Sequence, residues 1–465
     1  MSESPAELLI TGIDRLVTMD PARTVLTGAA VAMRAGRIVD VGPEAVVASA
    51  HPGAERLDAL GGWVTPGFID AHQHLTGDRL ARASIPDDLA PGAAIFAWAV
   101  PLHGAHRPED DELSATLAAL EAVSNGVTCV IEAGTVAHPD SVVAGVTAVG
   151  IRASIGRWGW DVEQGPFAAP AAEVVARAGE LLDRYPPDGD GLVQAWVTLV
   201  GHDLMSDALV MEATELARSR GAHITYHLSP TDSDPTSYVR RTGKRPVVHL
   251  DALGVLGPHL LLAHALHIDE AELELLLARD VAVASCPWAY LRLGQGMSRV
   301  GRHLDFVNRG GHLALGCDSE NAGDQIDVLR AAALFAGVGK DSAIDPTLPG
   351  AHLALELATI RGAHAIGRAH DLGSIEVGKR ADLVVFDSDR PEWRPVGDDV
   401  ALQLVWGTDG RSVRHVVVAG EVVVRNGAST RVDERELGVR ANVVGAELRR
   451  RAGVEVTSAW PVRDA

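Results

Sequence analysis

The sequence predicts an α/β protein, a (β/α)8 TIM-like barrel with a small β-sandwich domain built from both chain ends. Eight short apolar runs alternate with helical segments rich in Ala and Leu through the middle of the chain, which is the pattern of βα units around a parallel sheet. Short β-branched runs bounded by turn residues occur near both ends. A chain of 465 residues has room for a barrel and a second domain.

The apolar runs are the predicted barrel strands, and the chemistry of such a barrel lies at the C-terminal ends of its strands. They cover residues 64–70, 127–132, 151–156, 192–200, 223–227, 260–264, 281–286 and 313–317. The division of the chain follows from where these runs begin and end. We predict a composite β-sandwich domain from residues 1–62 and 372–430, a metal-binding barrel from 63–371, and a C-terminal helical tail from 431–465.

One barrel helix has clear end signals in the sequence. Pro108 is followed by acidic residues through Glu112, which favour the first turn of a helix because they complement the helix dipole. Asn125 and Gly126 tolerate the left-handed backbone that ends a helix. A helix between these signals would connect the first two barrel strands.

Composition narrows the classes of partner. Lys and Arg number 41 against 62 Asp and Glu, and the resulting net charge of -21 repels nucleic acid and anionic membranes. The three cysteines form no C-x-x-C pair, which argues against a disulfide framework or a thiolate metal site. Neither a signal-like N-terminus nor a membrane-spanning run is present. We expect a cytoplasmic protein that acts on a small molecule.

The first predicted strand ends in a His-x-His pair, His72 and His74. Residues i and i+2 of a strand point to the same side, so both imidazoles can reach one ion. The pair alone also fits two hydrogen-bonded structural histidines. Three further groups come at other strand ends: His227, His264 and Asp318. Imidazole and carboxylate donors converging on one rim suit Zn, Fe, Co or Mn, with a position left for water.

Four motifs resemble the metal-dependent amidohydrolase superfamily, and within it the cytosine deaminase and s-triazine hydrolase-like branch. They are Pro66-Gly-Phe-Ile-Asp-Ala-His-Gln-His74, Gly126-Val-Thr128, Gly316-Cys-Asp318 and the run from Leu372 to Asp387 that contains Gly-Ser-Ile-Glu-Val-Gly-Lys-Arg-Ala-Asp-Leu. The resemblance spans nearly the whole chain. It implies a metal-dependent hydrolase that forms a homodimer or homotetramer.

The resemblance also implies roles for individual residues. His72, His74, His227 and Asp318 would hold one divalent ion, for which zinc is the first expectation. Asp318 would accept a proton from the attacking water, and His264 would hydrogen-bond to that water or to the substrate oxygen. Members with two ions bridge them through a lysine at the end of strand four. The three lysines of this chain, at positions 244, 340 and 379, lie elsewhere, which indicates a mononuclear site.

The sequence departs from this branch after strand five. Nucleobase deaminases carry His-x-x-Glu there, whereas this chain has His227-Leu-Ser-Pro230, and proline has no side-chain proton to give. Either another residue replaces the glutamate (His202, Asp232 or Asp234) or the substrate needs no ring protonation. The first expectation is therefore hydrolysis of a C–N bond of amide, urea, carbamate or thiocarbamate type in a small, fairly apolar molecule.

Two alternatives stay open at the level of sequence. One is an aminohydrolase acting on a heteroaromatic ring such as a nucleobase, an adenosine analogue or an s-triazine. The other is a non-catalytic assembly protein of the same superfamily. Candidate substrate contacts are His202, by resemblance, and aromatic residues that follow strands three and seven, which fit core packing equally well: Trp158, Trp160, Trp288 and Tyr290.

Overall fold

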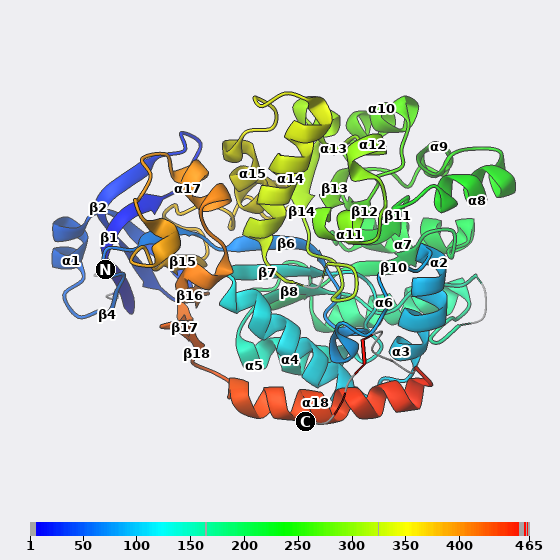
Figure 1. Ribbon diagram of the computed structural model, residues 1–465, viewed down its shortest axis with the longest axis horizontal. Coiled ribbons are helices and arrows are strands. Elements are labelled where there is room, and N and C mark those ends of the chain that lie inside the picture. The colour runs from blue at the N-terminus through cyan, green and yellow to red at the C-terminus, as the bar shows by residue number, and fades with distance from the viewer. Residues whose placement is uncertain (1–5, 163–164, 324, 455–459, 462, 464–465) are drawn as a thin grey trace.

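The computed structural model describes the chain except residues 1–5, 163–164, 324, 455–459, 462 and 464–465. Its fold confirms the predicted α/β barrel with a small β domain built from both chain ends. In Figure 1 the small domain lies at the left, the barrel fills the centre and right, and the last helix runs along the lower edge. Among the described residues, no helix is long and apolar enough to cross a membrane.

The small domain contains one mixed sheet of nine strands. Its order is β18-β17-β16-β15-β5-β1-β2-β3, and β4 pairs with β1. The bounds are β1 Leu8–Val17, β2 Val25–Arg34, β3 Arg37–Pro43, β4 Glu55–Asp58, β5 Trp63–Pro66, β15 Leu383–Phe386, β16 Val413–Val418, β17 Glu421–Arg425 and β18 Ala428–Ser429. One hydrogen-bonded path joins the strands of both chain ends, because β5 and β15 pair in antiparallel register.

The barrel strands form two parallel sheets. The first is β6 Phe68–Gln73, β7 Val127–Glu132, β8 Arg152–Ile155 and β9 Val193–Ala195. The second is β10 Val197–Gly201, β11 Ile224–Leu228, β12 Leu260–His264, β13 Ala282–Ser285 and β14 His312–Leu315. All eight predicted strands are present. The fourth is divided at Trp196, whose N–H donates to Ile155 while that of Val197 donates to His223.

The first predicted strand, 64–70, divides between the two domains. Gly67 N donates to the Asp382 carbonyl of the small domain, and Phe68 N donates to the Gly126 carbonyl of the barrel. A side chain at Gly67 would collide with Thr128, because a Cβ there would lie 2.0 Å from Thr128 Oγ1. The apolar run therefore serves both sheets, and the change of partner falls at the glycine.

Helices cover the barrel on its outside. Helix α4, Pro108–Ser124, has the predicted proline and acidic first turn, and Gly126 follows with a φ of +82°. The other helices before residue 300 are α1 Glu44–Ala50, α2 Pro91–Ala93, α3 Val100–Gly104, α5 Pro139–Val149, α6 Ala171–Arg184, α7 Asp207–Ser219, α8 Ser233–Thr242, α9 Pro246–Ala252, α10 Glu270–Ala278, α11 Pro287–Arg292 and α12 Met297–Val300. Those after it are α13 His303–Asn308, α14 Val328–Ala343, α15 Ala351–Ala358, α16 Ile360–Ala365, α17 Val400–Trp406 and α18 Glu434–Ala452.

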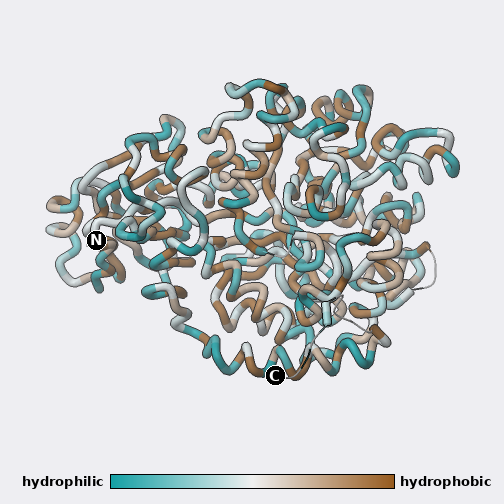
Figure 2. Tube along the Cα trace, viewed as in Figure 1, coloured by the Kyte–Doolittle hydropathy of each residue, from teal (hydrophilic) through white to brown (hydrophobic). Residues whose placement is uncertain are grey.

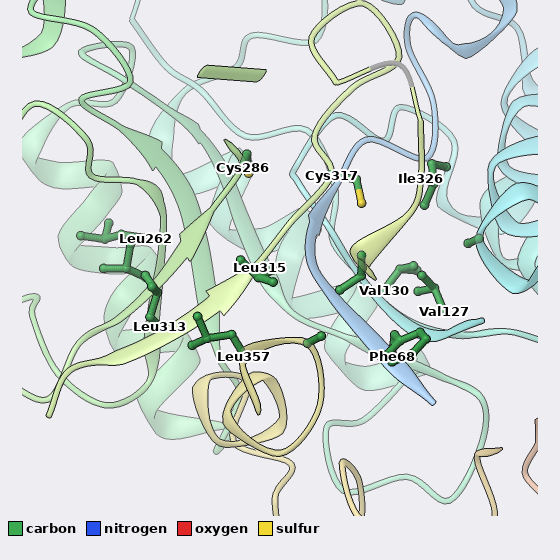
Figure 3. Close-up of a cluster of buried hydrophobic side chains, with 14 of the residues drawn as sticks. Phe68, Val127, Val130, Leu262, Cys286, Leu313, Leu315, Cys317, Ile326 and Leu357 are labelled. Atoms are coloured by element: carbon green, nitrogen blue, oxygen red, sulfur yellow. The ribbon is translucent and has the colours of Figure 1, made fainter. Parts of the chain in front are cut away.

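Hydrophobic residues, brown along the trace in Figure 2, occur throughout the strands and helices, and the buried ones form the core between them. In the cluster of Figure 3, Phe68 and Val130 of the first sheet lie near Leu315 of β14 and Leu357 of α15. All four are fully buried. Interiors packed in this way transmit strain rather than absorb it, so the strand ends above the cluster are held in place.

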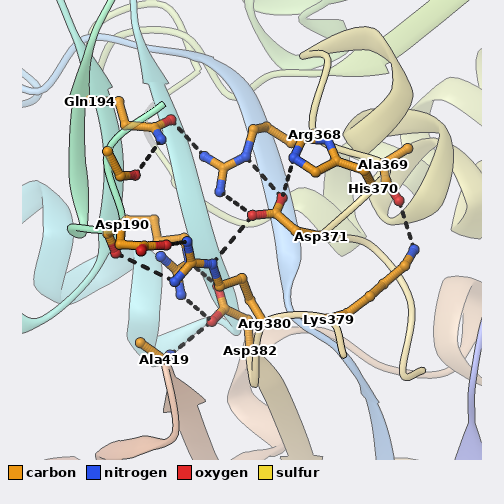
Figure 4. Close-up of polar contacts among 12 residues, drawn as sticks. Asp190, Gln194, Arg368, Ala369, His370, Asp371, Lys379, Arg380, Asp382 and Ala419 are labelled. Carbon is orange, nitrogen blue, oxygen red and sulfur yellow. Dashed lines mark hydrogen bonds and ion pairs between the residues drawn. The ribbon is translucent and has the colours of Figure 1, made fainter. Parts of the chain in front are cut away.

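A buried ion pair joins the barrel to the small domain. Arg152 of β8 donates to both carboxylate oxygens of Asp382 at 2.6 and 3.0 Å, and Ala419 N donates to the same carboxylate. Figure 4 shows the neighbouring network, in which Arg368 and Arg380 both contact Asp371. The Gly-Ser-Ile-Glu-Val-Gly-Lys-Arg-Ala-Asp-Leu motif thus fixes the orientation of the two domains.

Candidate active site

Five side chains meet at the C-terminal ends of the barrel strands, as predicted. His72 lies at the end of β6 and His74 just after it, His227 lies in β11, His264 ends β12, and Asp318 follows β14. All five are buried. The barrel closes at this point, because Asp318 N donates to the His72 carbonyl over 2.9 Å.

The nitrogens and oxygens of these groups are close enough to share one ion. His74 Nε2 lies 3.2 Å from His227 Nε2 and 3.4 Å from Asp318 Oδ1. His72 Nε2 lies 3.8 Å from Asp318 Oδ1, and His264 Nε2 lies 4.0 Å from Asp318 Oδ2. Ligand atoms of His72, His227 and His264 all fall within 4.8 Å of one another.

Hydrogen bonds on the far side of the His227 and His74 rings aim their Nε2 atoms inward. His227 Nδ1 donates to the Val200 carbonyl at 2.6 Å, and His74 Nδ1 lies 3.1 Å from Thr135 Oγ1. This is how metal-binding histidines are usually oriented. His72 Nε2 is buried without a hydrogen-bond partner among the described residues. A divalent cation in the middle of the cluster would satisfy it.

The protonation states of His72, His227 and Asp318 suit metal ligands. Burial lowers the pKa of His74, but the hydrogen bond and charge of Asp318 outweigh burial and raise that pKa above its usual value. Burial lowers the pKa of His72 and His227 well below the usual value, so both imidazoles are neutral. Burial alone would raise the pKa of Asp318, but its hydrogen bond with His74 holds that pKa well below the usual range. Neutral imidazoles and an ionised carboxylate are the forms that bind metal.

The strand ends turn sharply at this rim. His202, His264 and Asp318 have φ values of +55°, +74° and +67°, a region that non-glycine residues rarely adopt. Gly201 has φ +85°, and a Cβ there would lie 2.5 Å from His227 N. Strained backbone of this kind persists where the surrounding structure determines it, and it gathers at functional sites.

A largely apolar pocket opens over the ligand cluster. It is lined on its apolar side by Ile85, Ala94, Ile95, Ala99, Val100, Trp158, Trp160, Val200, Leu204, Pro230, Leu293 and Ala322. Trp158 and Trp160 meet edge to face, with ring centroids 5.6 Å apart. Such walls favour a small molecule with apolar surface.

The predicted substrate contacts divide into two groups. His202 and Trp158 line the pocket, and so does Trp160. Trp288 and Tyr290 are not among its lining residues. The ring of Trp288 lies beneath Arg330, at 4.8 Å, and Tyr290 OH lies 3.3 Å from His264 Nδ1. Tyr290 therefore supports His264, rather than facing the pocket.

Pro230 also lines the pocket, at the place where the branch carries its glutamate. Of the three candidate substitutes, Asp232 is exposed. Asp234 is buried, lies 3.2 Å from His202 Nδ1, and accepts a hydrogen bond from Ser229 N. His202 stacks on His227, with centroids 5.3 Å apart. The pair of His202 and Asp234 thus lies beside the ligand cluster.

Six polar residues of the pocket lining were not predicted: Asp78, His103, Thr135, Gln295, Ser319 and Asn321. Asp78 Oδ2 accepts hydrogen bonds from Asn321, whereas Asp78 Oδ1 is buried without a partner among the described residues. In the sequence, only the position of Asp78 in the loop after the first barrel strand indicated that it could face the active site. Such an oxygen can accept a hydrogen bond from a ligand.

The barrel and its histidine–carboxylate cluster define a metal-dependent hydrolase that acts on C–N bonds other than peptide bonds. The chain belongs to the amidohydrolase family, whose model matches residues 63–423. The retained cluster argues against the non-catalytic alternative.

Relatives of known activity cover most of the chain. It is 30% identical over 433 residues to a 5-methylthioadenosine/S-adenosylhomocysteine deaminase of Syntrophobacter fumaroxidans, covering 92% of this chain and 94% of that protein. It is 31% identical over 377 residues to a 5'-deoxyadenosine deaminase of Methanopyrus kandleri, covering 80% and 84%. These similarities favour the aminohydrolase alternative over the amide, urea or carbamate chemistry that the sequence analysis placed first.

Solved structures agree on the fold. A zinc-bound adenosine deaminase of Xanthomonas campestris matches with a TM-score of 0.89 and 29% identity, covering 97% of this chain and 100% of that one. A zinc complex of atrazine chlorohydrolase from Arthrobacter aurescens matches with a TM-score of 0.85 and 23% identity, covering 94% and 100%. The second likeness concerns the fold alone.

Proposed function

We propose that this protein is a mononuclear zinc-dependent aminohydrolase that removes an amino group from a small, largely apolar heteroaromatic molecule. The convergence of four imidazoles and Asp318 beneath an apolar pocket carries the proposal. The deaminase relatives support the choice of reaction, and the zinc-bound adenosine deaminase supports the choice of metal.

His72, His74, His227 and Asp318 are the proposed ligands. A divalent ion held there would supply a water whose pKa is lowered to about 7. Asp318 accepts the proton of the attacking water through the carboxylate oxygen that faces His264. His264 hydrogen-bonds to the oxygen that adds to the attacked carbon, and Tyr290 orients its ring from behind.

The leaving nitrogen needs a proton, and the branch's glutamate is absent. His202 is the proposed donor. It lines the pocket, and Asp234 on its far side stabilises the protonated ring. Trp158 and Trp160 form the proposed wall against which a flat substrate packs.

A second candidate function is favoured by Pro230. A carbonyl substrate of the carbamate, thiocarbamate or urea class has no ring nitrogen that requires a proton. A proline at position 230, which lines the pocket, would therefore not slow its hydrolysis. The apolar lining of the pocket suits such molecules equally well.

One panel of assays separates the two candidates. Zinc-loaded protein is incubated with adenosine, 5'-methylthioadenosine and amino-s-triazines, and separately with N-alkyl carbamates, thiocarbamates and phenylureas. Release of ammonia from the first set supports the aminohydrolase. Mass spectrometry of the reaction identifies the deaminated product. Turnover confined to the second set would transfer the proposal to carbonyl C–N hydrolysis. The Asp318→Asn variant is the control for metal-dependent turnover in either case.

A further inference from the structure

Helix α18 lies along the outside of the barrel, at the lower edge of Figure 1. Its inner face is anchored: Leu448 is buried against Leu80, Leu102 and Leu113. Arg451 forms an ion pair with Asp110 near its C-terminal end. The helix therefore presents one defined face to solvent.

That outer face carries a regular stripe. It consists of Glu436, Val439, Val443, Ala446 and Arg450, and we call it the α18 stripe. Spacings alternate between three and four residues, which is the pattern of a coiled-coil seam. All five residues are exposed, Val439 to 63% and Val443 to 66%. Val439 and Val443 lie on successive turns of an anchored helix, so a surface that covers both would remove their apolar area from water.

The charges at the two ends of the stripe specify the partner. Glu436 lies at the start of the stripe and Arg450 at its end, about 21 Å apart along the axis at 1.5 Å per residue. Within the described part of the chain, neither side chain forms an ion pair or hydrogen bond. A second copy of α18, antiparallel about a two-fold axis near Val443, would place each Glu436 opposite an Arg450. A parallel copy would place like charges together.

We propose that the α18 stripe is the interface of a two-fold symmetric homodimer of this chain. The same patch then serves both copies, as a two-fold interface requires. The valines and Ala446 lose water in the middle, and two Glu436–Arg450 pairs fix the antiparallel orientation at the ends. Antiparallel helices also bring opposite ends of their dipoles together. The inference is independent of the substrate.

Light scattering coupled to size exclusion tests the proposal on the full-length, metal-loaded protein. At micromolar concentration the natural chain is expected at twice its 48.9 kDa, or at a higher even multiple. Val443→Glu places two acids at the axis and should halve that mass. Val46→Glu is the matched control, because Val46 is 64% exposed on α1 at the other domain. A cooperative thermal transition and unchanged zinc content establish that both variants are folded.

Charge exchange tests the orientation. Glu436→Arg and Arg450→Glu should each weaken the dimer, with a dissociation constant raised at least about fivefold. Combining the two substitutions restores opposite charges across the axis and should restore the constant. A monomeric natural chain, an unchanged mass for Val443→Glu, or a double variant no tighter than the single ones would overturn the proposal.

Discussion

His227 Nε2 lies 3.2 Å from His74 Nε2, although 153 residues separate the two in the chain. The Nδ1–H of His227 donates a hydrogen bond to the Val200 carbonyl, so the Nε2 of the neutral ring carries a lone pair. The hydrogen bond of His74 Nδ1 to Thr135 leaves its Nε2 facing the same point. A shared cation resolves this opposition of lone pairs.

Replacing His227 should therefore abolish metal binding. His227→Ala is expected to lower zinc content, measured by plasma mass spectrometry, from about one ion per chain to near zero, and to lower turnover at least about 100-fold. His352→Ala is the control, because His352 is exposed and lies outside the barrel mouth. A His227 variant that keeps a full equivalent of zinc would contradict the ligand assignment.

Asp234→Asn tests the proposed proton donor. Burial lowers the pKa of His202, but the charge and hydrogen bond of Asp234 outweigh burial and raise that pKa above its usual value. Without the Asp234 charge the pKa of His202 should fall. If protonated His202 is the donor, the alkaline limb of the pH–kcat profile should move to lower pH, while zinc content is unchanged. An identical profile would exclude His202 from proton transfer.

Gly201→Ala should destabilise the barrel by at least about 2 kcal/mol. The positive φ of Gly201 disfavours any side chain, and a Cβ would collide with the His227 backbone. Gly221→Ala is the matched control. Gly221 also has a positive φ, +62°, but a Cβ there would meet no atom within 4 Å. Gly221→Ala should therefore lower the free energy of unfolding by only about 1 kcal/mol, the cost of the backbone conformation. Urea unfolding compares the two variants.

The Arg152–Asp382 pair should behave as a buried unit. Arg152→Met leaves the Asp382 carboxylate uncompensated and is expected to cost about 3–5 kcal/mol in urea unfolding. Adding Asp382→Leu removes the unpaired charge and should recover part of that loss. A double variant no more stable than Arg152→Met would show that the pair is not coupled.

Stability should fall as the pH drops from 6.5 toward 4. Burial lowers the pKa of His223 and His415 to about 4, so between these limits the unfolded chain binds protons that the folded chain does not. Each histidine then contributes up to about 1.4 kcal/mol per pH unit. Denaturation of the natural chain and of His223→Gln at several pH values checks this, and the variant should show the shallower dependence.

The eight barrel strands and the convergence of the five clustered side chains could be predicted because they depend on local pattern. Parallel strands end at one rim, so polar residues at those ends must converge there. The first predicted strand, 64–70, was expected to be a single barrel strand, whereas the structure divides it between β5 and β6. The run from Trp63 to Gln73 is buried throughout, and only Gly67 marks where it passes from one sheet to the other.

The pocket could be predicted only in part because its walls depend on long-range packing. Tyr290 follows a barrel strand, yet Pro287 starts a helix there and Tyr290 turns toward His264. Asp78 and His103 come from the long segment between β6 and α4. No periodicity in the sequence indicates which side chains of such a segment face inward.

The pairing of β5 with β15 has a consequence for synthesis on the ribosome. Strand β5 is made early, but its antiparallel partner emerges more than 300 residues later, so one edge of β5 stays open while the barrel is being translated. An open strand edge invites pairing with other chains. A nascent chain interrupted before Leu383 should therefore be prone to aggregate. Synthesis of β15 covers the open edge of β5 and so removes this hazard.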